Sequence, residues 1–410
     1  MVMTKKHTIV AGLDIGTSKV AAVIGEMTDR GVEIIGLGTH PSLGLRKGVV
    51  INIESTVDSI KKAVAEAELM AGCEIHAVFT SIGGCHIKGF NSHGVVAVKN
   101  KEVGAPDLDR VLEAAKAVAI PAEQEVIHLL PQEFILDEQD GIREPLGMSG
   151  VRLEARVHIV TGSSMAAQNV IKCCNRAGLN VAGLALIPLT TAEAVLTEKE
   201  RELGVAVVEI GAGTSYVAVY HDGSLRHTAV LPIGGNHVTN DIAIGLRTSF
   251  ADAERIKQRY GAAKASMVST EERIEVPSAA GKAAGSVSRQ ILCEIIEARL
   301  DEVFQLVREE IAKGGRVASP VAGAVMSGGS VLLPGAVETA ELVLEMPTRL
   351  GMPVHTRGLV DVISSPVYAA GVGLVMYGMM HQKRGPYGMR DDGFMAKFRH
   401  RMSYWLDEFF

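Results

Sequence analysis

Two short segments of this 410-residue chain repeat one pattern, and this repeat restricts the possible folds more than any other feature. Residues 13–23 read LDIGTSKVAAV and residues 208–219 read VEIGAGTSYVAV, the second with two extra residues, Ala212 and Gly213. In each segment apolar residues flank a Gly-Thr-Ser turn, which predicts a strand–turn–strand unit. Because the units lie about half a chain apart, they indicate a duplicated α/β architecture with a cleft between two similar halves.

Both turns carry groups that bind a nucleoside triphosphate. Glycine lets the backbone approach phosphate, threonine and serine add hydroxyl donors, and carboxylates hold Mg²⁺ largely through water. We therefore expect ATP and Mg²⁺ in the cleft, with Asp14 and Glu209 facing the phosphates from opposite sides as the metal-side carboxylates. The nucleotide-binding residues predicted on the two turns are Asp14, Gly16, Thr17, Ser18, Lys19, Glu209, Gly211, Gly213, Thr214 and Ser215.

A third glycine-rich segment could complete such a site. Residues 324–335, AVMSGGSVLLPG, predict a buried strand that runs into SGGS, with a helix starting near Pro334. Paired glycines at this junction let a flat nucleoside lie against the backbone, so we expect Gly328, Gly329 and Ser330 to bind it. Each of the three segments alone is better read as an ordinary turn. Their combination favours nucleotide binding.

Periodicity and capping residues divide the rest of the chain. Residues 84–162 read as an inserted β-rich module, with strand-like runs at 94–98, 125–130 and 151–160. Residues 381–393, HQKRGPYGMRDDG, read as a polar linker. Helices are predicted at 54–71, 106–119, 163–177 and 289–313.

Charge and cysteine content argue against several classes of function. A net charge of −6 gives no reason to expect nucleic acid as a partner. The cysteines are odd in number, include an adjacent pair and form no CxxC, which predicts a reducing compartment rather than a disulfide framework or a metal site. The apolar run near the N-terminus is too short for a signal peptide. The five cysteines are Cys73, Cys85, Cys173, Cys174 and Cys293.

One uncharged stretch approaches the length of a membrane span. It covers residues 362–380, VISSPVYAAGVGLVMYGMM. Ser365 followed by Pro366 reads as the N-cap and first residue of a helix. The glycines and other small residues favour a helix buried inside a domain over a transmembrane segment.

The last seventeen residues, FMAKFRHRMSYWLDEFF (394–410), predict an amphipathic helix on a membrane surface. At about 100° per residue the large apolar side chains share one face, flanked by cations that suit anionic lipid. A helix docked on the protein's own core is the alternative, but aromatic density, basic flanks and the preceding linker favour the membrane. The predicted membrane residues are Phe394, Met395, Lys397, Phe398, Arg399, Arg401, Met402, Trp405, Leu406, Phe409 and Phe410.

Two phosphate loops and a Gly-Gly loop in this order resemble the actin/Hsp70/sugar-kinase superfamily. Within it, the chain is similar to the FtsA family of bacterial cell-division proteins over nearly its whole length. The similarity includes GLDIGTSKVAAVIGE (12–26), LPQEFILDEQDGI (130–142), GMSGVRLEARVHIVT (147–161) and LRHTAVLPIGGNHVTNDIAIGL (225–246). It implies an actin-like α/β fold, duplicated around a nucleotide cleft, with an inserted β-rich subdomain and a C-terminal amphipathic helix.

The resemblance adds site residues on the second half. In the superfamily, a Glu and a Lys of the helix that matches AERIK contact ribose and adenine, and these are Glu254 and Lys257 here. On spacing alone they are a surface pair. Gly234 and Gly235, before a helix starting near His237, would line the same cleft.

The second loop departs from the family pattern, which is Asp-Ile-Gly-Gly-Gly-Thr with an Asp two residues later. The corresponding residues here are Glu209, Ala212 and Tyr216. A Glu shifts metal geometry by a methylene, and the missing carboxylate argues against efficient hydrolysis. We therefore expect a weak or absent ATPase, with Glu209 as the candidate catalytic residue and no residue marked as the base for water.

The resemblance also divides the chain into two halves with two appended subdomains. Half one would comprise 1–83, 163–195 and 360–380, and half two 196–226 and 303–359. The insert (84–162) would replace an actin subdomain, and 227–302 would form the subdomain that receives the C-terminal tail of FtsZ. The linker (381–393) and the membrane-targeting helix (394–410) follow.

These features imply a peripheral protein on the cytoplasmic face of the cell membrane at the division site. It would anchor FtsZ filaments, self-assemble, and recruit later division proteins, with ATP as a conformational ligand. Two alternatives share the fold. A sugar kinase would need a phosphoacceptor site and would leave the tail unexplained. A pilus-assembly adaptor can be distinguished by deleting the gene, which would then cause loss of pili, whereas loss of a division protein would cause filamentation. An Hsp70 chaperone is disfavoured because no peptide-binding domain follows the core.

Overall fold

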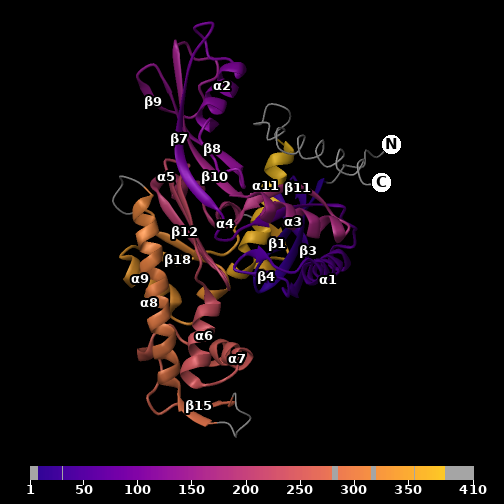
Figure 1. The fold of residues 1–410 in the computed structure, drawn as a ribbon, viewed down its shortest axis with the longest axis vertical. Coiled ribbons are helices and arrows are strands. Elements are labelled where there is room, and N and C mark those ends of the chain that lie inside the picture. Colours follow the sequence, from indigo (N-terminus) through magenta and orange to yellow (C-terminus); the bar gives the residue numbers. More distant parts are fainter. Residues whose placement is uncertain (1–7, 30, 279–284, 315–319, 355, 384–410) are drawn as a thin grey trace.

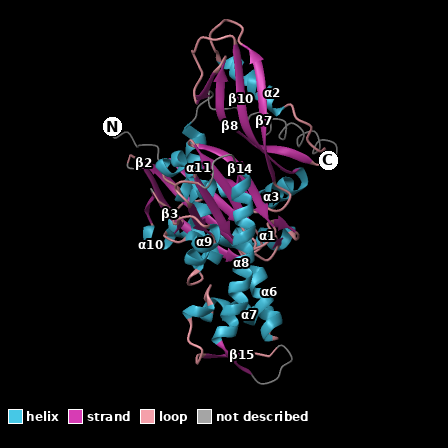
Figure 2. Cartoon of the chain, turned by 90° about the vertical axis from the view of Figure 1, so that its left-hand side faces the viewer, coloured by secondary structure: helices cyan, strands magenta, loops and turns pink. Residues whose placement is uncertain are grey.

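The chain forms two α/β halves side by side, with the insert at one end and a small helical lobe at the other (Figure 1). The computed structural model describes residues 8–29, 31–278, 285–314, 320–354 and 356–383. Insert and lobe lie at opposite ends of the longest axis in both views, so the molecule is elongated (Figure 2).

Each half is built around one of the two predicted hairpins. In half one, β1 (Thr8–Ile15) and β2 (Lys19–Thr28) pair antiparallel, with Asp14 opposite Ala21. In half two, β12 (Val205–Ile210) and β13 (Ser215–His221) pair in the same way, with Glu209 opposite Tyr216. The prediction of two strand–turn–strand units is confirmed.

The two sheets share the order of five strands, and the first sheet has one further strand, β19, at its edge. The first is β11-β6-β1-β2-β3-β19 and the second is β14-β13-β12-β17-β18. In each, the hairpin gains a third antiparallel strand on one side and two parallel strands on the other, as a duplication requires. Their other strands are β3 (Gly31–Pro41), β6 (Ala77–Ile82), β11 (Asn180–Leu186), β14 (Ser224–Leu231), β17 (Ala324–Ser327), β18 (Thr348–Leu350) and β19 (Thr356–Gly358). A small separate hairpin joins β4 (Leu45–Arg46) to β5 (Val49–Val50).

Helices and sheets alternate in five layers. α4 (Ile187–Val195) and α11 (Ala369–Lys383) lie between the sheets, where Leu374 shares a core with Phe79 of the first sheet and Val207 of the second. Separate apolar cores join the outer face of each sheet to its helices. The outer helices are α1 (Ile53–Ala71) and α3 (Ser164–Arg176) on the first sheet, and α8 (Arg289–Lys313) and α9 (Ala336–Leu344) on the second. Two short helices, α5 (Glu198–Leu203) and α10 (Val360–Ile363), lie in connections.

The insert is a four-stranded antiparallel sheet with one helix and a core of its own. Val111 of the helix packs in this core with Leu153 and Val157 of the sheet. Two of the strands extend beyond the predicted apolar runs because their further residues pair with a neighbouring strand of the sheet. In sheet order they are β7 (Lys88–Ala97), β10 (Arg152–Ser163), β8 (Gln124–Leu136) and β9 (Gln139–Ile142), covered by α2 (Ala105–Lys116).

The helical lobe extends half two away from the insert (Figure 1). The start of α8 packs against α6 in this lobe, and Leu292 of α8 shares a core with Ile242 of α6. The other elements of the lobe are α6 (Gly235–Leu246), α7 (Phe250–Tyr260), β15 (Arg273–Val276) and β16 (Gly285–Ser288).

Capping residues explain how well helix ends were predicted. The prediction for α8 is confirmed at both ends, where Ser288 accepts from the N–H of Gln290 and Gly314 follows the last turn. Helix α2 ends at Lys116, short of the predicted residue 119. In the stretch that begins at 324, α9 starts at Ala336, just after the expected Pro334.

The uncharged stretch at 362–380 forms buried structure. Ser365 accepts from the N–H of Val367 at the start of a short 3₁₀ turn, and α11 follows directly. Among the helices that the structure describes, none is long and apolar enough to cross a membrane. The linker prediction was wrong at its start, since α11 continues to Lys383. The rest of the linker and the predicted membrane helix (394–410) lie outside the described residues.

Candidate functional site: the cleft between the halves

The three glycine-rich segments meet at one cavity between the halves, of about 730 Å³. The end of β1 and the start of β2 contribute from half one, and the β12–β13 turn and the segment after β17 from half two. The cavity is lined by fourteen of the predicted residues: Asp14, Gly16, Thr17, Ser18, Lys19, Glu209, Gly211, Thr214, Gly235, Glu254, Lys257, Gly328, Gly329 and Ser330.

Three predicted residues do not line the cavity. The hydroxyl of Ser215 donates to the carbonyl of Ile233 (2.8 Å), and the residue is fully buried. Successive side chains of a strand point to opposite faces, so Ser215, at the start of β13, points away from the cavity that Thr214 lines. A Cβ at Gly213 would lie 2.9 Å from the hydroxyl of Thr17, so Gly213 lets the two phosphate loops approach each other. A Cβ at Gly234 would lie 2.5 Å from the carbonyl of Gly211, which gives Gly234 a packing role.

A buried carboxylate, Asp14, and a partly buried one, Glu209, line the cleft. Asp14 accepts a hydrogen bond from the hydroxyl of Ser81 (2.9 Å), and Glu209 accepts one from Thr191. Burial raises the pKa of Asp14, although Lys19 and Ser81 oppose the shift. Burial, with the nearby charge of Asp14, raises the pKa of Glu209 to about 8. A divalent cation would offset the repulsion between the two, so this pair suits Mg²⁺.

Lys19 is the cation beside these carboxylates and also contacts the segment just before α11. Its ammonium donates to the carbonyl of Val367 (2.7 Å) and lies 4.6 Å from the ring centroid of Tyr368. Burial lowers the pKa of Lys19, while Asp14 and Glu209 raise it. The lysine therefore ties the first phosphate loop to the 3₁₀ turn that precedes α11.

The other end of the cavity is formed by α6, α7 and the segment after β17. Lys257 pairs with Glu254 (2.7 Å) and donates to the hydroxyl of Thr239 (2.8 Å) and the carbonyl of Gly235 (3.1 Å). Burial raises the pKa of Glu254, but the hydrogen bonds from Lys257 and Thr239 hold it below its usual value. With Lys257 only 9% exposed, the pair is not the surface pair that spacing alone suggests.

The turn after β17 is fixed by glycine. Gly328 has a φ of +89°, and a Cβ there would lie 2.5 Å from the carbonyl of Ile210. The hydroxyl of Ser330 donates to the carbonyl of Gly211 (3.1 Å), which joins this turn to the second phosphate loop. These contacts fix the backbone of Gly329 where it lines the cavity.

Some contributors carried no local signal in the sequence. Ser81, Thr191 and Thr239 orient Asp14, Glu209 and Lys257, yet each lies on a different element from its partner. Tyr216, noted as a departure from the family pattern, also lines the cavity. A hydroxyl residue beside a charged one in space cannot be recognised from spacing.

The residues present fit a Mg²⁺-bound nucleoside triphosphate. Bound Mg²⁺ would neutralise phosphate charge beside Asp14 and Glu209, largely through water. In such a complex Thr17 and Thr214 would offer hydroxyls to phosphate, and Lys257 and Glu254 would offer polar groups to ribose and base. Among the described residues no cluster of three or more His, Cys, Asp or Glu could hold a metal, so the pair would rely on water and phosphate as further ligands.

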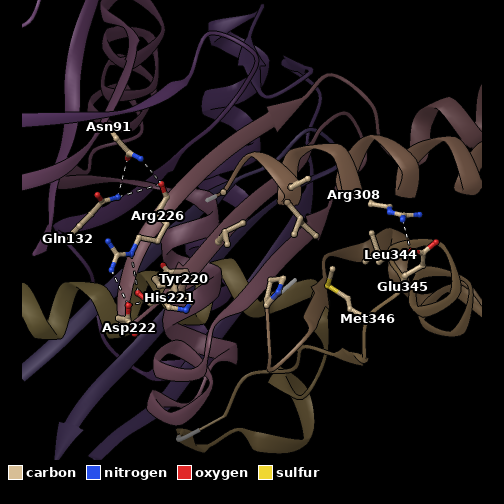
Figure 3. A pocket seen from close by; sticks show the side chains of 15 residues that line it. Asn91, Gln132, Tyr220, His221, Asp222, Arg226, Arg308, Leu344, Glu345 and Met346 are labelled. Atoms are coloured by element: carbon tan, nitrogen blue, oxygen red, sulfur yellow. Dashed lines mark hydrogen bonds and ion pairs between the residues drawn. The ribbon is translucent and has the colours of Figure 1, made fainter. Parts of the chain in front are cut away.

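A second cavity, of about 550 Å³, lies where the insert meets half two and the C-terminal end of α8 (Figure 3). Its arginines are engaged: Arg226 pairs with Asp222 (3.4 Å) and Arg308 with Glu345 (2.6 Å). With its cations paired, this cavity is poorly suited to phosphate.

Two family models match the chain. The model described as "Cell division protein FtsA" matches residues 206–373, and the one described as "SHS2 domain inserted in FTSA" matches residues 84–161. The second match covers the insert and begins at its first predicted residue.

Curated relatives match over most of the chain. Cell division protein FtsA of Pseudomonas aeruginosa is 52% identical over 94% of this chain and 93% of its own length. The proteins of the same name from Neisseria meningitidis and Escherichia coli are 46% and 43% identical, over 91% and 92% of this chain and the same shares of their own lengths.

Solved structures share the fold at low sequence identity. The PilM-PilN type IV pilus biogenesis complex matches with a TM-score of 0.67 at 17% identity, covering 90% of this chain and 98% of that chain. MreB5 of Spiroplasma citri bound to ADP matches with a TM-score of 0.55 at 13% identity, covering 92% and 97%. These likenesses show the actin-like fold alone.

Proposed function

We propose, because this chain belongs to the FtsA family of cell division proteins, that it binds ATP and Mg²⁺ in its cleft and anchors FtsZ filaments to the cytoplasmic face of the cell membrane. The observation that carries the nucleotide part is the meeting of both phosphate loops and the Glu254–Lys257 pair at one cavity. Self-assembly and recruitment of later division proteins follow from the family.

In this proposal ATP acts by binding one conformation better than another, and the free energy of its hydrolysis is not used. A ligand shifts a conformational equilibrium only by as much as it binds one state better, and a cleft between two halves provides such a difference. Hydrolysis is slow or absent, because Tyr216 occupies the position of a carboxylate and Glu209 is held by Thr191. A brisk ATPase that disappears in Glu209→Gln would contradict this part.

The nucleotide site is tested by removing one hydroxyl from each loop. Thr17→Ala and Thr214→Ala each lose a charge-assisted hydrogen bond, worth about 1.5–3 kcal/mol, so ATP affinity should fall about tenfold or more by calorimetry. Ser215→Ala is the matched control, since its hydroxyl bonds to Ile233 outside the cavity. Unchanged affinity in both folded threonine variants would refute the site.

The helical lobe is the proposed receptor for the FtsZ tail. It exposes Ile244 of α6 (69%) and Ile291 of α8 (46%), with the cation Arg247 next to the end of α6. Exposed aliphatics beside a cation suit a peptide that has both apolar and acidic side chains. Ile244→Glu should therefore abolish capture of FtsZ, whereas Leu342→Glu, an equally exposed position (63%) on α9, should not.

The membrane part is tested with liposomes that contain anionic lipid. Burying several large apolar side chains, each worth roughly 1.5–3 kcal/mol at most, should bind the protein, with about 1 kcal/mol more from each nearby cation. Trp405→Glu, or truncation after Gly393, should release both the protein and FtsZ from the liposomes, while ATP affinity stays unchanged. Binding should also weaken with salt, through screening of Lys397, Arg399 and Arg401.

Two outcomes separate the parts of this proposal. If truncation unfolds the protein and the intact chain ignores liposomes, the last helix is a docked core element. If the intact chain binds liposomes but leaves FtsZ in solution, membrane binding stands and the FtsZ link falls.

A further inference from the structure

Tyr216 crosses the cleft from one half to the other. It belongs to β13 of half two, yet its ring packs with Ile187 of α4 and Ala370 of α11 in a small core of its own. The residue is only 2% exposed, and its hydroxyl reaches the cavity wall. A polar group buried this deeply needs partners, and its partners come from both sides of the cleft.

Half one and the insert meet the hydroxyl with backbone alone. The N–H of Gly84, the first residue of the insert, donates to the Tyr216 oxygen (3.2 Å). A Cβ at Gly83 would lie 2.2 Å from that oxygen and one at Gly48 3.2 Å from it. Any side chain at Gly83 would displace the hydroxyl, so these glycines form a socket for it.

From half two, the hydroxyl of Thr214 donates to the same oxygen (3.0 Å). A serine or threonine hydroxyl has one proton to donate. A phosphate oxygen that accepted the proton of Thr214 would leave Tyr216 to supply the proton of their shared bond, because the Thr214 oxygen can still accept. Occupancy of the second phosphate loop would thus reverse the direction of the Thr214–Tyr216 hydrogen bond.

The base of the insert begins at Gly84. The carbonyl of Gly84 accepts from the N–H of Ile87 (3.1 Å), closing the turn that leads into β7. Within that turn, His86 accepts from the N–H of Ser163 at the end of β10 (3.2 Å). The Gly84 amide therefore lies next to β7 and β10, the two strands through which the insert joins half one.

We propose that Tyr216 is a positioning residue that couples occupancy of the nucleotide cleft to the base of the insert, through Thr214 on one side and Gly84 on the other. The proposal rests on the proposed nucleotide site and adds to it a route from phosphate to the insert. When Thr214 donates to phosphate, the Tyr216 hydroxyl donates to Thr214 while its oxygen still accepts from Gly84, and in this head-to-tail chain the bond from Gly84 strengthens.

Hydrogen exchange on the peptide that spans Gly83–Ile87 tests this coupling, with ATP affinity measured in parallel by calorimetry. In the wild type, saturating Mg²⁺-ATP should slow exchange there about twofold, because a hydrogen bond in a cooperative chain strengthens by a fraction of its own energy. Tyr216→Phe keeps the ring and removes the hydroxyl. Its exchange should be fast with and without ATP, because the N–H of Gly84 has then lost its acceptor in both states.

Tyr220→Phe is the matched control, because Tyr220 is a buried tyrosine of the same strand that lines the second cavity instead. It should behave as the wild type. If Tyr216→Phe fails to fold, Thr214→Val removes the same hydrogen bond from the other side, and saturating ATP should then leave Gly84 unchanged.

The coupling is overturned if the wild type binds ATP with no change at Gly84, or if Tyr216→Phe keeps the ATP response. Both results leave the nucleotide site standing. If calorimetry shows no ATP binding to the wild type, the proposed nucleotide site fails and the coupling fails with it.

Discussion

At the scale of single residues, the cleft floor holds two carboxylates at the end of matching strands, and their surroundings differ. Asp14 has the cation Lys19 and the hydroxyl of Ser81 to support its charge. For Glu209, burial and the charge of Asp14 outweigh Thr191 and Lys19. Both carboxylates are costly to ionise in the folded chain, and the proton of Glu209 is linked to folding.

The pH dependence of unfolding should reveal this proton. The pKa of Glu209 rises from its ordinary 4.5 to about 8 in the folded chain, so the stability it contributes is complete below pH 4.5 and is lost as pH rises through 8. Between pH 6.5 and 8 the wild type should lose roughly 2 kcal/mol, read from urea midpoints. Glu209→Gln, which has no charge to bury, should show a flatter profile, and an unchanged slope would contradict the assignment.

The sequence identified most residues that line the cleft but not the partners that orient them. Thr17, Thr214 and Gly328 could be named because turn chemistry is local and three such glycine-rich turns occur in one chain. Ser215 was misplaced by the same reasoning, since a turn motif does not reveal on which side of the strand the next side chain falls. Thr191 and Thr239 are brought to the site only by tertiary packing.

At the scale of elements, the contact between α11 and α4 shows why the uncharged stretch is a core helix. Gly373 faces α4 so closely that a Cβ there would lie 1.7 Å from the carbonyl of Thr190. Both residues are buried between the two sheets. Small residues in this stretch thus serve close packing between helices within the protein.

Gly373→Ala should therefore destabilise the protein despite the better helix propensity of alanine. Overpacking against a backbone atom should cost about 1–3 kcal/mol or more, measured by urea denaturation. Gly245→Ala in α6 is the control, because its Cβ would meet only the flexible end of Ile295 (2.7 Å). That change should stay within about 1 kcal/mol. Equal effects of both substitutions would argue against a close α11–α4 contact.

Element boundaries were predicted well where caps are local and less well where pairing decides. Helix α8 begins after a serine cap and is followed by glycine, and both signals are visible in the sequence. Strand β7 begins at Lys88, well before the apolar run at 94, because its first residues pair with β10 rather than with an apolar core. Its start depends on a partner strand far along the chain.

At the scale of the whole molecule, a seam of buried polar groups holds the insert against both halves. His158 of β10 bonds to Asn91 within the insert (2.7 Å) and to Thr228 of half two (2.8 Å). On the other side, His128 of β8 accepts from the N–H of Leu186 in half one (3.0 Å). The duplicated core could be inferred from the repeated motif, but no sequence pattern indicated where the insert would dock.

This seam should make the protein sensitive to mild acid. Burial, together with His227 near His158 and His381 near His128, lowers the pKa of both seam histidines from 6.5 to about 4. Their contribution to stability is complete above pH 6.5 and is lost as pH falls through 4. From pH 6.5 to 5 each should cost roughly 2 kcal/mol. Over this range His158→Gln should lose roughly 2 kcal/mol less than the wild type, and an identical acid profile would show that His158 does not contribute.

The two ends of the insert meet in a single ladder, where Lys88 of β7 lies opposite Thr161 of β10. Directly opposed residues of such a ladder have Cα atoms roughly 5 Å apart, a gap that a short hairpin loop could also close. From the standpoint of the surrounding chain, the whole insert is thus equivalent to a turn. A segment with this property can be gained, lost or exchanged by recombination without redirecting the chain on either side. The same pair of strands is also a suitable place to graft a foreign domain whose own termini lie close together.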